Sequence, residues 1–209
     1  MLAQSVNKVV RKLPAWPIYV LVAADIGWLF WQALNGQMGP EPVKALEHAY
    51  GEMALKLIIV VLSITPLLRL ARINLVKFRR ALGLGAFGFV LAHLLVYVVL
   101  DVQAVSAIWA DIVKRPYISV GMAGFVLMLP LAITSNNLSV RRMGGRAWRK
   151  LHWLTYPAAV LGGVHFVLLR KGWQVEPLSY LAIIAALLLI RLAWQLRTKM
   201  GSPRMPIDV

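Results

Sequence analysis

Six runs of apolar residues alternate with short polar segments along the chain. Each run holds about 18 to 20 residues, which is long enough to cross the roughly 30 Å hydrocarbon core of a bilayer as an α-helix. The pattern predicts an all-α fold in which a single polytopic membrane domain, residues 1–209, forms a six-helix bundle. The expected helices cover about 15–34, 53–70, 82–100, 117–134, 151–169 and 177–196.

The polar segments set the expected orientation, because the cytoplasmic loops of membrane proteins are enriched in Lys and Arg. The segments after the second and fourth runs are strongly basic and contain no acid, whereas the other segments are nearly neutral. Both chain termini are therefore predicted to be cytoplasmic. The cations of the two basic segments are Arg72, Lys77, Arg79 and Arg80, and then Arg141, Arg142, Arg146, Arg149 and Lys150.

The first apolar run follows Lys8, Arg11 and Lys12, as the core of a secretory signal would. It is longer than a typical signal core, and no clear small-residue cleavage site follows it. We therefore interpret 15–34 as an uncleaved first helix.

The composition limits the kinds of ligand and metal site that the chain can form. The chain is 60% hydrophobic and 15% charged, with a formal net charge of +15. The cations lie in short loops between apolar runs, which favours membrane topology over nucleic-acid binding. There is no cysteine, which excludes disulfides, thiolate zinc sites and iron–sulfur ligation by this chain. Any metal would have to use the four histidines, the few carboxylates or methionine.

Two histidines lie at similar depth in the third and fifth runs. Both runs enter from the cytoplasmic side, so a rise of about 1.5 Å per residue places His93 roughly 16 Å and His165 roughly 21 Å into the membrane. Ionisable residues in membrane helices are rare and usually face the bundle interior. Two neutral imidazoles on different helices can clamp one iron axially, so the spacing favours a haem held by His93 and His165.

The other two histidines fit this site less well. His152 lies about 20 Å of helix rise below His165, so it cannot readily share an iron with His93. It is a candidate ligand of a second haem, and His48 is expected to be a solvated loop residue. Spacing alone also allows the histidines to hydrogen-bond between helices or, with Asp25 in the first helix, to line the polar pathway of a small transporter.

A glycine pattern in the third run invites two interpretations. Gly83, Gly85 and Gly88 form a literal G-x-G-x-x-G, but the dinucleotide fingerprint needs a preceding strand, which a basic loop replaces here. Together with Ala92, the glycines instead form a small-residue face that allows close approach of a helix or a flat macrocycle. We predict that Gly85 and Gly88 pack against the cofactor beside His93.

Several ordered stretches then indicate a family. In their order and spacing they resemble the MsrQ family, the haem-binding membrane subunits of bacterial periplasmic protein-methionine-sulfoxide reductase systems, within the wider ferric-reductase-like group. The stretches are Glu41-Pro-Val-Lys44, Thr65-Pro-Leu67, Arg80-Ala-Leu-Gly-Leu84 with His93, Lys114-Arg-Pro-Tyr117, Thr134-Ser135, and Trp148 through Leu151-His152 to Tyr156 and His165.

The resemblance implies a function in the bacterial inner membrane. It implies b-type haem on His93 and His165, with His152 as an additional candidate ligand, and an FMN for which no motif matches. Electrons would pass from the quinone pool or a cytosolic flavin reductase to a periplasmic molybdenum-containing methionine-sulfoxide reductase, of which this chain is not the catalytic subunit. Phe166 stands where the family pattern has tyrosine. A ferric reductase or a quinone-linked cytochrome b for another partner is the redox alternative.

Overall fold

The fold is built of helices joined by short connections. The computed structural model describes residues 2–170 and 174–200, and within these ranges there is no β-strand. Six helices are long and apolar enough to cross a membrane, so the predicted all-α, six-helix bundle is confirmed. These candidate spans are Trp16–Leu34, Pro42–Leu70, Val76–Val102, Pro116–Ile133, Gly145–Leu169 and Val175–Arg197.

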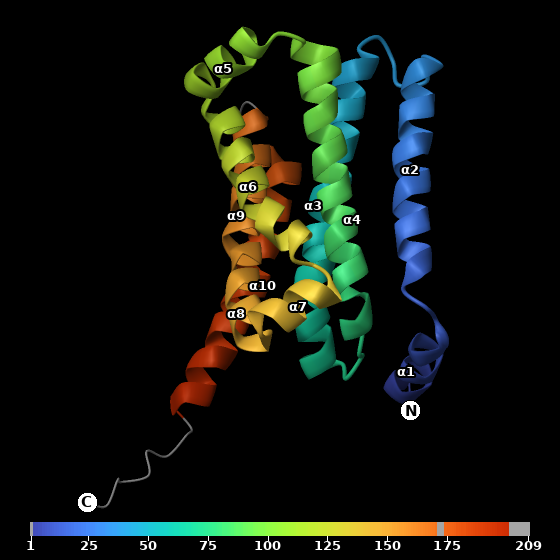
Figure 1. Ribbon diagram of the computed structural model, residues 1–209, viewed down its shortest axis with the longest axis vertical. Coiled ribbons are helices and arrows are strands. Elements are labelled where there is room, and N and C mark those ends of the chain that lie inside the picture. Colours follow the sequence, from blue (N-terminus) through green and yellow to red (C-terminus); the bar gives the residue numbers. More distant parts are fainter. Residues whose placement is uncertain (1, 171–173, 201–209) are drawn as a thin grey trace, which may run out of the picture.

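Short helices flank the long ones at both ends of the bundle. In Figure 1, α1, α7 and α8 lie at one end and α5 lies at the other. The elements are α1 (Leu2–Lys12), α2 (Trp16–Leu34), α3 (Pro42–Leu70), η1 (Val76–Phe78), α4 (Arg79–Leu95), η2 (Val96–Val102), α5 (Val105–Lys114), α6 (Pro116–Ile133), α7 (Asn137–Met143), α8 (Gly145–Leu151), η3 (His152–Leu154), α9 (Thr155–Leu169) and α10 (Val175–Met200).

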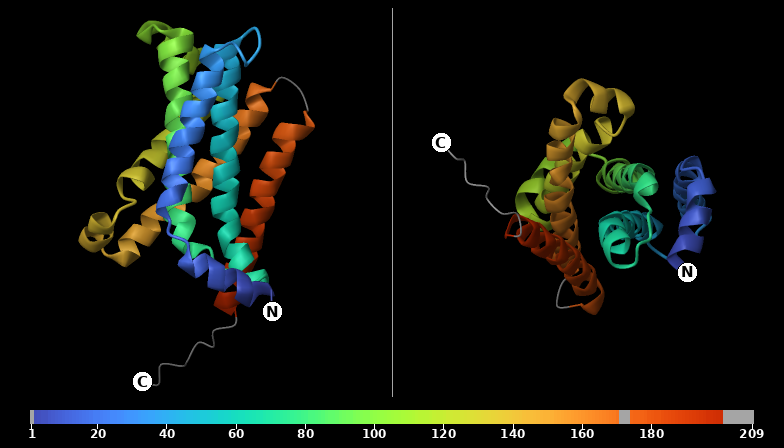
Figure 2. Two further views of the ribbon diagram at one scale, coloured as in Figure 1. Left: turned by 90° about the vertical axis from the view of Figure 1, so that its right-hand side faces the viewer. Right: turned by 90° about the horizontal axis from the view of Figure 1, so that it is seen from below.

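The long helices form two groups, α2 with α3 and α4, and α6 with α9 and α10 (Figure 2). Within the groups, α3 packs closely on α4 and α6 packs closely on α9, whereas α4 meets α6 at few positions. One buried cluster joins the groups across the middle of the bundle, and a second lies between α3 and α4 under α2. The joining cluster contains Leu55, Ile58, Leu62, Ala86, Ala159 and Ile184.

Helix α3 begins at Pro42, eleven residues before the expected start at residue 53. The charged side chains of residues 42–52 suggested a loop. In the structure these side chains form ion pairs at the end of the bundle, so the helix can include them. Lys44 pairs with Asp101 of η2, and Lys56 pairs with Glu52 one turn away at 2.6 Å. The proline at the helix start suits a position whose N–H would have no helical partner.

Pro66 inside α3 creates a local defect that α10 repairs. A proline has no N–H, so the carbonyl of Leu62 lacks its normal donor four residues later. The Arg191 side chain reaches across from α10 and donates Nη2–H to that carbonyl at 2.6 Å. The helix therefore keeps a buried carbonyl satisfied at a proline, as a membrane helix must.

Charge divides the two ends of the bundle. The end that carries α1, α7 and α8 holds the two basic segments found in the sequence, and α1 is tied to it by Asn7, which donates to the carbonyl of Arg72 at 2.8 Å. The end that carries α5 holds most of the acids, among them Asp101 and Asp111. We refer to these as the basic end and the mixed-charge end.

Candidate functional site

His93 and His165 face each other across the interior of the bundle. His93 lies near the end of α4 and His165 lies on α9, and their ring centroids are 6.1 Å apart with the ring planes at 83°. Metal–imidazole bonds of about 2.0 Å on opposite sides of one ion would place two ring centroids roughly 6 Å apart. The observed separation therefore fits two axial ligands of a single metal.

Each ring is oriented by a backbone carbonyl on a neighbouring helix. His93 Nδ1 lies 2.8 Å from the carbonyl oxygen of Glu47 on α3, and His165 Nδ1 lies 2.6 Å from that of Tyr117 on α6. A carbonyl can only accept, so Nδ1 of each ring carries the proton and donates it. The lone pair of each neutral ring is then on Nε2, the tautomer in which Nε2 can bind a metal.

A glycine lies under each ring. A Cβ built on Gly51 would be 3.2 Å from His93 Nδ1, and one built on Gly121 would be 2.7 Å from His165 Nδ1. Each glycine follows the residue that supplies the carbonyl by four positions, 47 to 51 and 117 to 121. One helical turn after a carbonyl, a missing side chain leaves room for an imidazole to reach that oxygen.

These four supporting positions were not identified from the sequence. Glycines are common in membrane helices, and nothing local to Gly51 or Gly121 indicates that a histidine 42 or 44 residues away lies on it. The sequence does repeat one spacing, a glycine four residues after the residue whose carbonyl accepts the bond. This spacing can be interpreted only when it is known which helices pack against each other. The two halves of the site thus share one construction without an evident sequence repeat.

The two histidines line a cavity of about 500 Å³. This is within the range of roughly 300–1,000 Å³ that holds cofactors and other small ligands. Most of its lining is apolar or aromatic, and the part near the mixed-charge end, here called the mouth, carries cations together with the carboxylates of Glu47 and Glu52. Residues of the wall include Leu55, Ile58, Phe125, Met128 and Phe166, and the mouth includes Lys44, Arg115 and Arg170.

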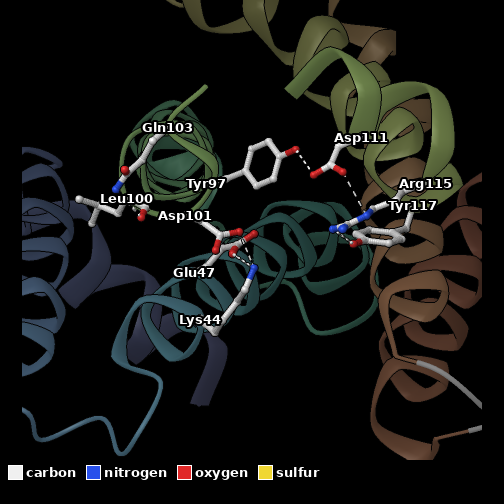
Figure 3. Close-up of polar contacts among 9 residues, drawn as sticks. All are labelled: Lys44, Glu47, Tyr97, Leu100, Asp101, Gln103, Asp111, Arg115 and Tyr117. Carbon is white, nitrogen blue, oxygen red and sulfur yellow. Dashed lines mark hydrogen bonds and ion pairs between the residues drawn. The ribbon is translucent and has the colours of Figure 1, made fainter. Parts of the chain in front are cut away.

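A network of polar side chains surrounds this mouth (Figure 3). Tyr97 donates to Asp111 at 3.1 Å, and Arg115 pairs with the same carboxylate at 3.2 Å. Lys44 lies between Asp101 and Glu47 and pairs with both, the Glu47 pair at 3.7 Å. The network joins α3, η2, α5 and the segment before α6, so it fixes the helix ends that supply the two carbonyls.

Helix η2 continues α4 as a π-helix directly after the histidine turn. It covers Val96–Val102, and the chain then leaves the helix at Gln103 with a φ of 58°. A π-turn adds a residue to the helical repeat and is frequent near functional sites. Here it carries Tyr97 and Asp101, the two side chains through which α4 joins the polar network.

Arg170, at the cavity mouth, has a buried hydrogen-bond donor that no described residue accepts. Its guanidinium carbon lies 6.0 Å from the ring centre of Phe166, and its Nε is buried without a hydrogen-bond partner among the described residues. None of the ion pairs found in the described residues includes it. The arginine therefore offers a charged donor to an anion inside the cavity.

The remaining sequence candidates lie elsewhere than expected. His48 lies on α3 and lines the histidine cavity, and is not in a solvated loop. Gly85 and Gly88 have a different neighbour from the predicted cofactor: Cβ atoms there would meet Val22 of α2, at 2.8 and 3.8 Å, so this small-residue face receives a helix.

His152 is separated from the histidine pair. It lines a second cavity of about 570 Å³ nearer the basic end, in which it is the only histidine. Its Nδ1 lies 3.0 Å from the carbonyl oxygen of Trp148, and its ring stacks on the Trp148 ring at 3.7 Å between centroids. Asp25, on α2, lines neither cavity.

Comparison with known proteins shows which family has this architecture. The family described as the ferric reductase-like transmembrane component matches residues 49–163, which include His93 and end two residues before His165. Relatives from Brucella ovis, Brucella canis and Brucella suis, each named protein-methionine-sulfoxide reductase heme-binding subunit MsrQ, are 46% identical over 179 residues. The matches cover 85% of this chain and 81% of each relative. No solved structure matches.

Proposed function

Because the chain belongs to the MsrQ family of ferric-reductase-like membrane proteins, we propose that it is a haem b subunit that passes electrons through the membrane to a methionine-sulfoxide reductase. The observation that carries the proposal is the pair of facing imidazoles, His93 and His165, with ring centroids 6.1 Å apart in one cavity. The relatives' name supports the cofactor and the assembly, and the geometry supports the choice of the two histidines as ligands.

The donor set fits haem better than a metal held by protein alone. Among the described residues there is no group of three or more His, Cys, Asp or Glu side chains that could hold a metal ion. Two imidazoles therefore need a macrocycle to complete the coordination of iron, and an axial pair of this kind is found in b-type cytochromes. A haem held by His93 and His165 would supply one-electron transfer.

The chain's own residues prepare the site for this role. The carbonyls of Glu47 and Tyr117 fix the tautomer and the orientation of the two rings, and such partners raise ligand basicity. Gly51 and Gly121 give the rings room to reach those oxygens. At the mouth, Arg170 is positioned to pair with a carboxylate of the cofactor.

We propose that electrons move from the basic end towards the mixed-charge end. Cytoplasmic loops are enriched in Lys and Arg, which supports both termini lying in the cytoplasm of a bacterial inner-membrane protein. The histidine cavity is lined in part by residues of the opposite end, Lys44 and Arg115 among them, which supports a periplasmic position for its mouth. The proposed donor is the quinone pool or a cytosolic flavin reductase, and the proposed acceptor is a periplasmic molybdenum-containing reductase.

Two further cofactors, FMN and a second haem, remain proposals. FMN is implied by the family resemblance, and neither cavity carries a motif that assigns it. A second haem on His152 would need an axial partner other than histidine, because His152 is the only histidine of its cavity and all four histidines of the chain lie in the described residues.

The visible spectrum of the purified full chain tests the proposal. After haem-sufficient expression we expect a Soret band and, in the dithionite-reduced protein, the sharp α band of a six-coordinate b-type haem. The reduced protein should be reoxidised by the periplasmic reductase subunit and not by ferric citrate. Faster reoxidation by ferric citrate would favour a ferric reductase, and absence of a Soret band would favour a transporter.

A further inference from the structure

Helix α1 presents apolar side chains that the rest of the described chain leaves exposed. In Figure 2, α1 (dark blue, beside the N label) runs across the direction of the long helices at the basic end. Val6 is 38% exposed and Val9 is 59% exposed, and Leu13, directly after the helix, is 51% exposed. Apolar side chains that gather on one face of an exposed helix mark a surface that something apolar covers.

Hydrogen bonds fasten α1 to the connection between α3 and α4. The side-chain amide of Asn7 donates to the carbonyl of Arg72 at 2.8 Å, and its oxygen accepts from the backbone N–H of Asn74 at 2.9 Å. Lys77 donates its ammonium to the backbone carbonyl of Arg11 at 3.0 Å. These contacts join residues far apart in the sequence, so they fix both the position of α1 and its rotation about its own axis.

The fixed rotation gives α1 three different faces. Residues three apart share a face of a helix, and each further residue turns by about 100° around the axis. One face therefore meets the α3–α4 connection, an apolar face lies about a quarter turn to one side, and a basic face lies about a quarter turn to the other. The three faces carry, in this order, Asn7 with the buried Val10, Val6 with Val9, and Lys8 with Arg11. A helix that lies in the membrane surface beside a bundle needs this arrangement, with protein, acyl chains and head groups on successive sides.

The cations of α1 are available to an external anion. Lys8, Arg11 and Lys12 are all exposed, and none of them belongs to an ion pair found among the described residues. Basic side chains on the polar side of an amphipathic helix attract the anionic head groups of a membrane surface. The charge of α1 therefore favours an anionic lipid surface as the phase that its apolar face enters.

The position of α1 along the bundle agrees with the expected level of the membrane surface. Trp16 begins α2, the first candidate span, and is 63% exposed. Exposed tryptophans at the ends of spanning helices lie at the membrane–water interface. Only residues 13–15 separate Trp16 from the end of α1 at Lys12. Helix α1 therefore ends close to the level at which the chain enters the bilayer.

We propose that α1 lies in the head-group layer of the bilayer and binds anionic lipid there. Its apolar face enters the boundary of the acyl chains to a depth of about 5–10 Å, and its basic face contacts the phosphate groups. The assignment of this surface to the cytoplasmic leaflet rests on the proposed orientation of the chain. Through Asn7 and Lys77, α1 then fastens the connection between α3 and α4 to the membrane surface.

Spin labels on two faces of α1 test its placement. The chain contains no cysteine, so a single introduced cysteine carries the label without background. Val9→Cys and Lys8→Cys are labelled separately in the full chain, and single chains are reconstituted in nanodiscs of mixed phosphatidylglycerol and phosphatidylcholine. Power saturation in electron paramagnetic resonance then compares collisions with oxygen, which concentrates among acyl chains, and with a water-soluble nickel chelate. The oxygen-to-nickel ratio should be severalfold higher for the label at position 9 than for the label at position 8.

A second measurement tests the choice of anionic lipid. A fluorophore on Val9→Cys is quenched by spin-labelled phosphatidylglycerol or by spin-labelled phosphatidylcholine, and we expect stronger quenching by the anionic lipid. Arg11→Gln should reduce this preference about fivefold, the contribution of one cation near an anionic surface. It leaves the backbone carbonyl that accepts from Lys77 in place. The matched control is Arg142→Gln, an exposed cation at the same end outside α1, and it should keep the preference.

Three results would overturn the proposal. Equal nickel access at positions 8 and 9 would turn the apolar face towards water, as a surface for a soluble protein. Protection of position 9 from both reagents would show that protein covers this face. Equal quenching by the two lipids, or equal losses of preference in Arg11→Gln and Arg142→Gln, would remove anionic lipid as the ligand. None of these measurements involves haem, so their failure leaves the proposed function standing.

Discussion

Replacing Gly121 by alanine tests whether the proposed haem site needs the space that this glycine leaves for the His165 ring. The new Cβ would lie 2.7 Å from Nδ1 and 2.9 Å from Cε1 of His165. An ordinary contact needs at least 3.4 Å, so the ring must move by about 0.7 Å. That movement stretches the 2.6 Å hydrogen bond to the Tyr117 carbonyl and shifts the Nε2 that would bind the haem iron.

The expected loss follows from the role of such outer hydrogen bonds. Removing the partner of a metal-binding histidine typically weakens metal binding on the order of 10–100-fold. Gly51→Ala is the milder counterpart, since its Cβ would lie 3.2 Å from His93 Nδ1 and needs a movement of about 0.2 Å. The affinity for haem should therefore fall more for Gly121→Ala than for Gly51→Ala.

The assay is a titration of apoprotein with haem, followed at the Soret band. Gly27→Ala on α2 is the matched control, because nothing lies within 4 Å of its new Cβ and it should bind haem like the wild type. Circular dichroism of each variant checks that the helices are retained. Equal affinity in Gly121→Ala and Gly27→Ala, or a larger loss in Gly51→Ala, would refute the reasoning.

Three further changes probe the surroundings of the site. Gly85→Ala places its Cβ 2.8 Å from a Val22 methyl, so it should destabilise the fold by about 1–3 kcal/mol at unchanged haem content; selective haem loss would restore the cofactor-packing role expected from the sequence. Arg170→Gln removes a cation at the cavity mouth and should lower the haem reduction potential in a redox titration, whereas an unchanged potential would argue against contact with the cofactor. Tyr97→Phe removes the hydrogen bond to Asp111, worth about 1 kcal/mol, and should lower the Tm by roughly 2–4 °C; an unchanged Tm would show that this bond is not stabilising.

The sequence was most informative where one local property determines structure. Apolar runs long enough to cross the hydrocarbon core of a bilayer identified the six helices, and the resemblance to the MsrQ family is confirmed by the relatives. The early start of α3 was missed because Lys44 and Glu52 look solvated until Asp101 and Lys56 are seen to pair with them. The sequence alone does not show which charged side chains will form ion pairs.

The site was predictable only in part for a similar reason. Depth along a helix follows from residue counting, so His93 and His165 could be paired from the sequence. The face of a helix that a glycine occupies depends on which helix lies beside it, and so Gly85 was assigned to the cofactor when it packs on α2. Gly121, which does touch a histidine, carried no local signal.

The most direct test of the central claim is the haem content per chain of three purified histidine variants. The account predicts that His93→Ala and His165→Ala each lose the same haem, whereas His152→Ala, altered in the other cavity, retains it. Equal haem retention in all three variants would contradict the axial pair and the electron-transfer function derived from it.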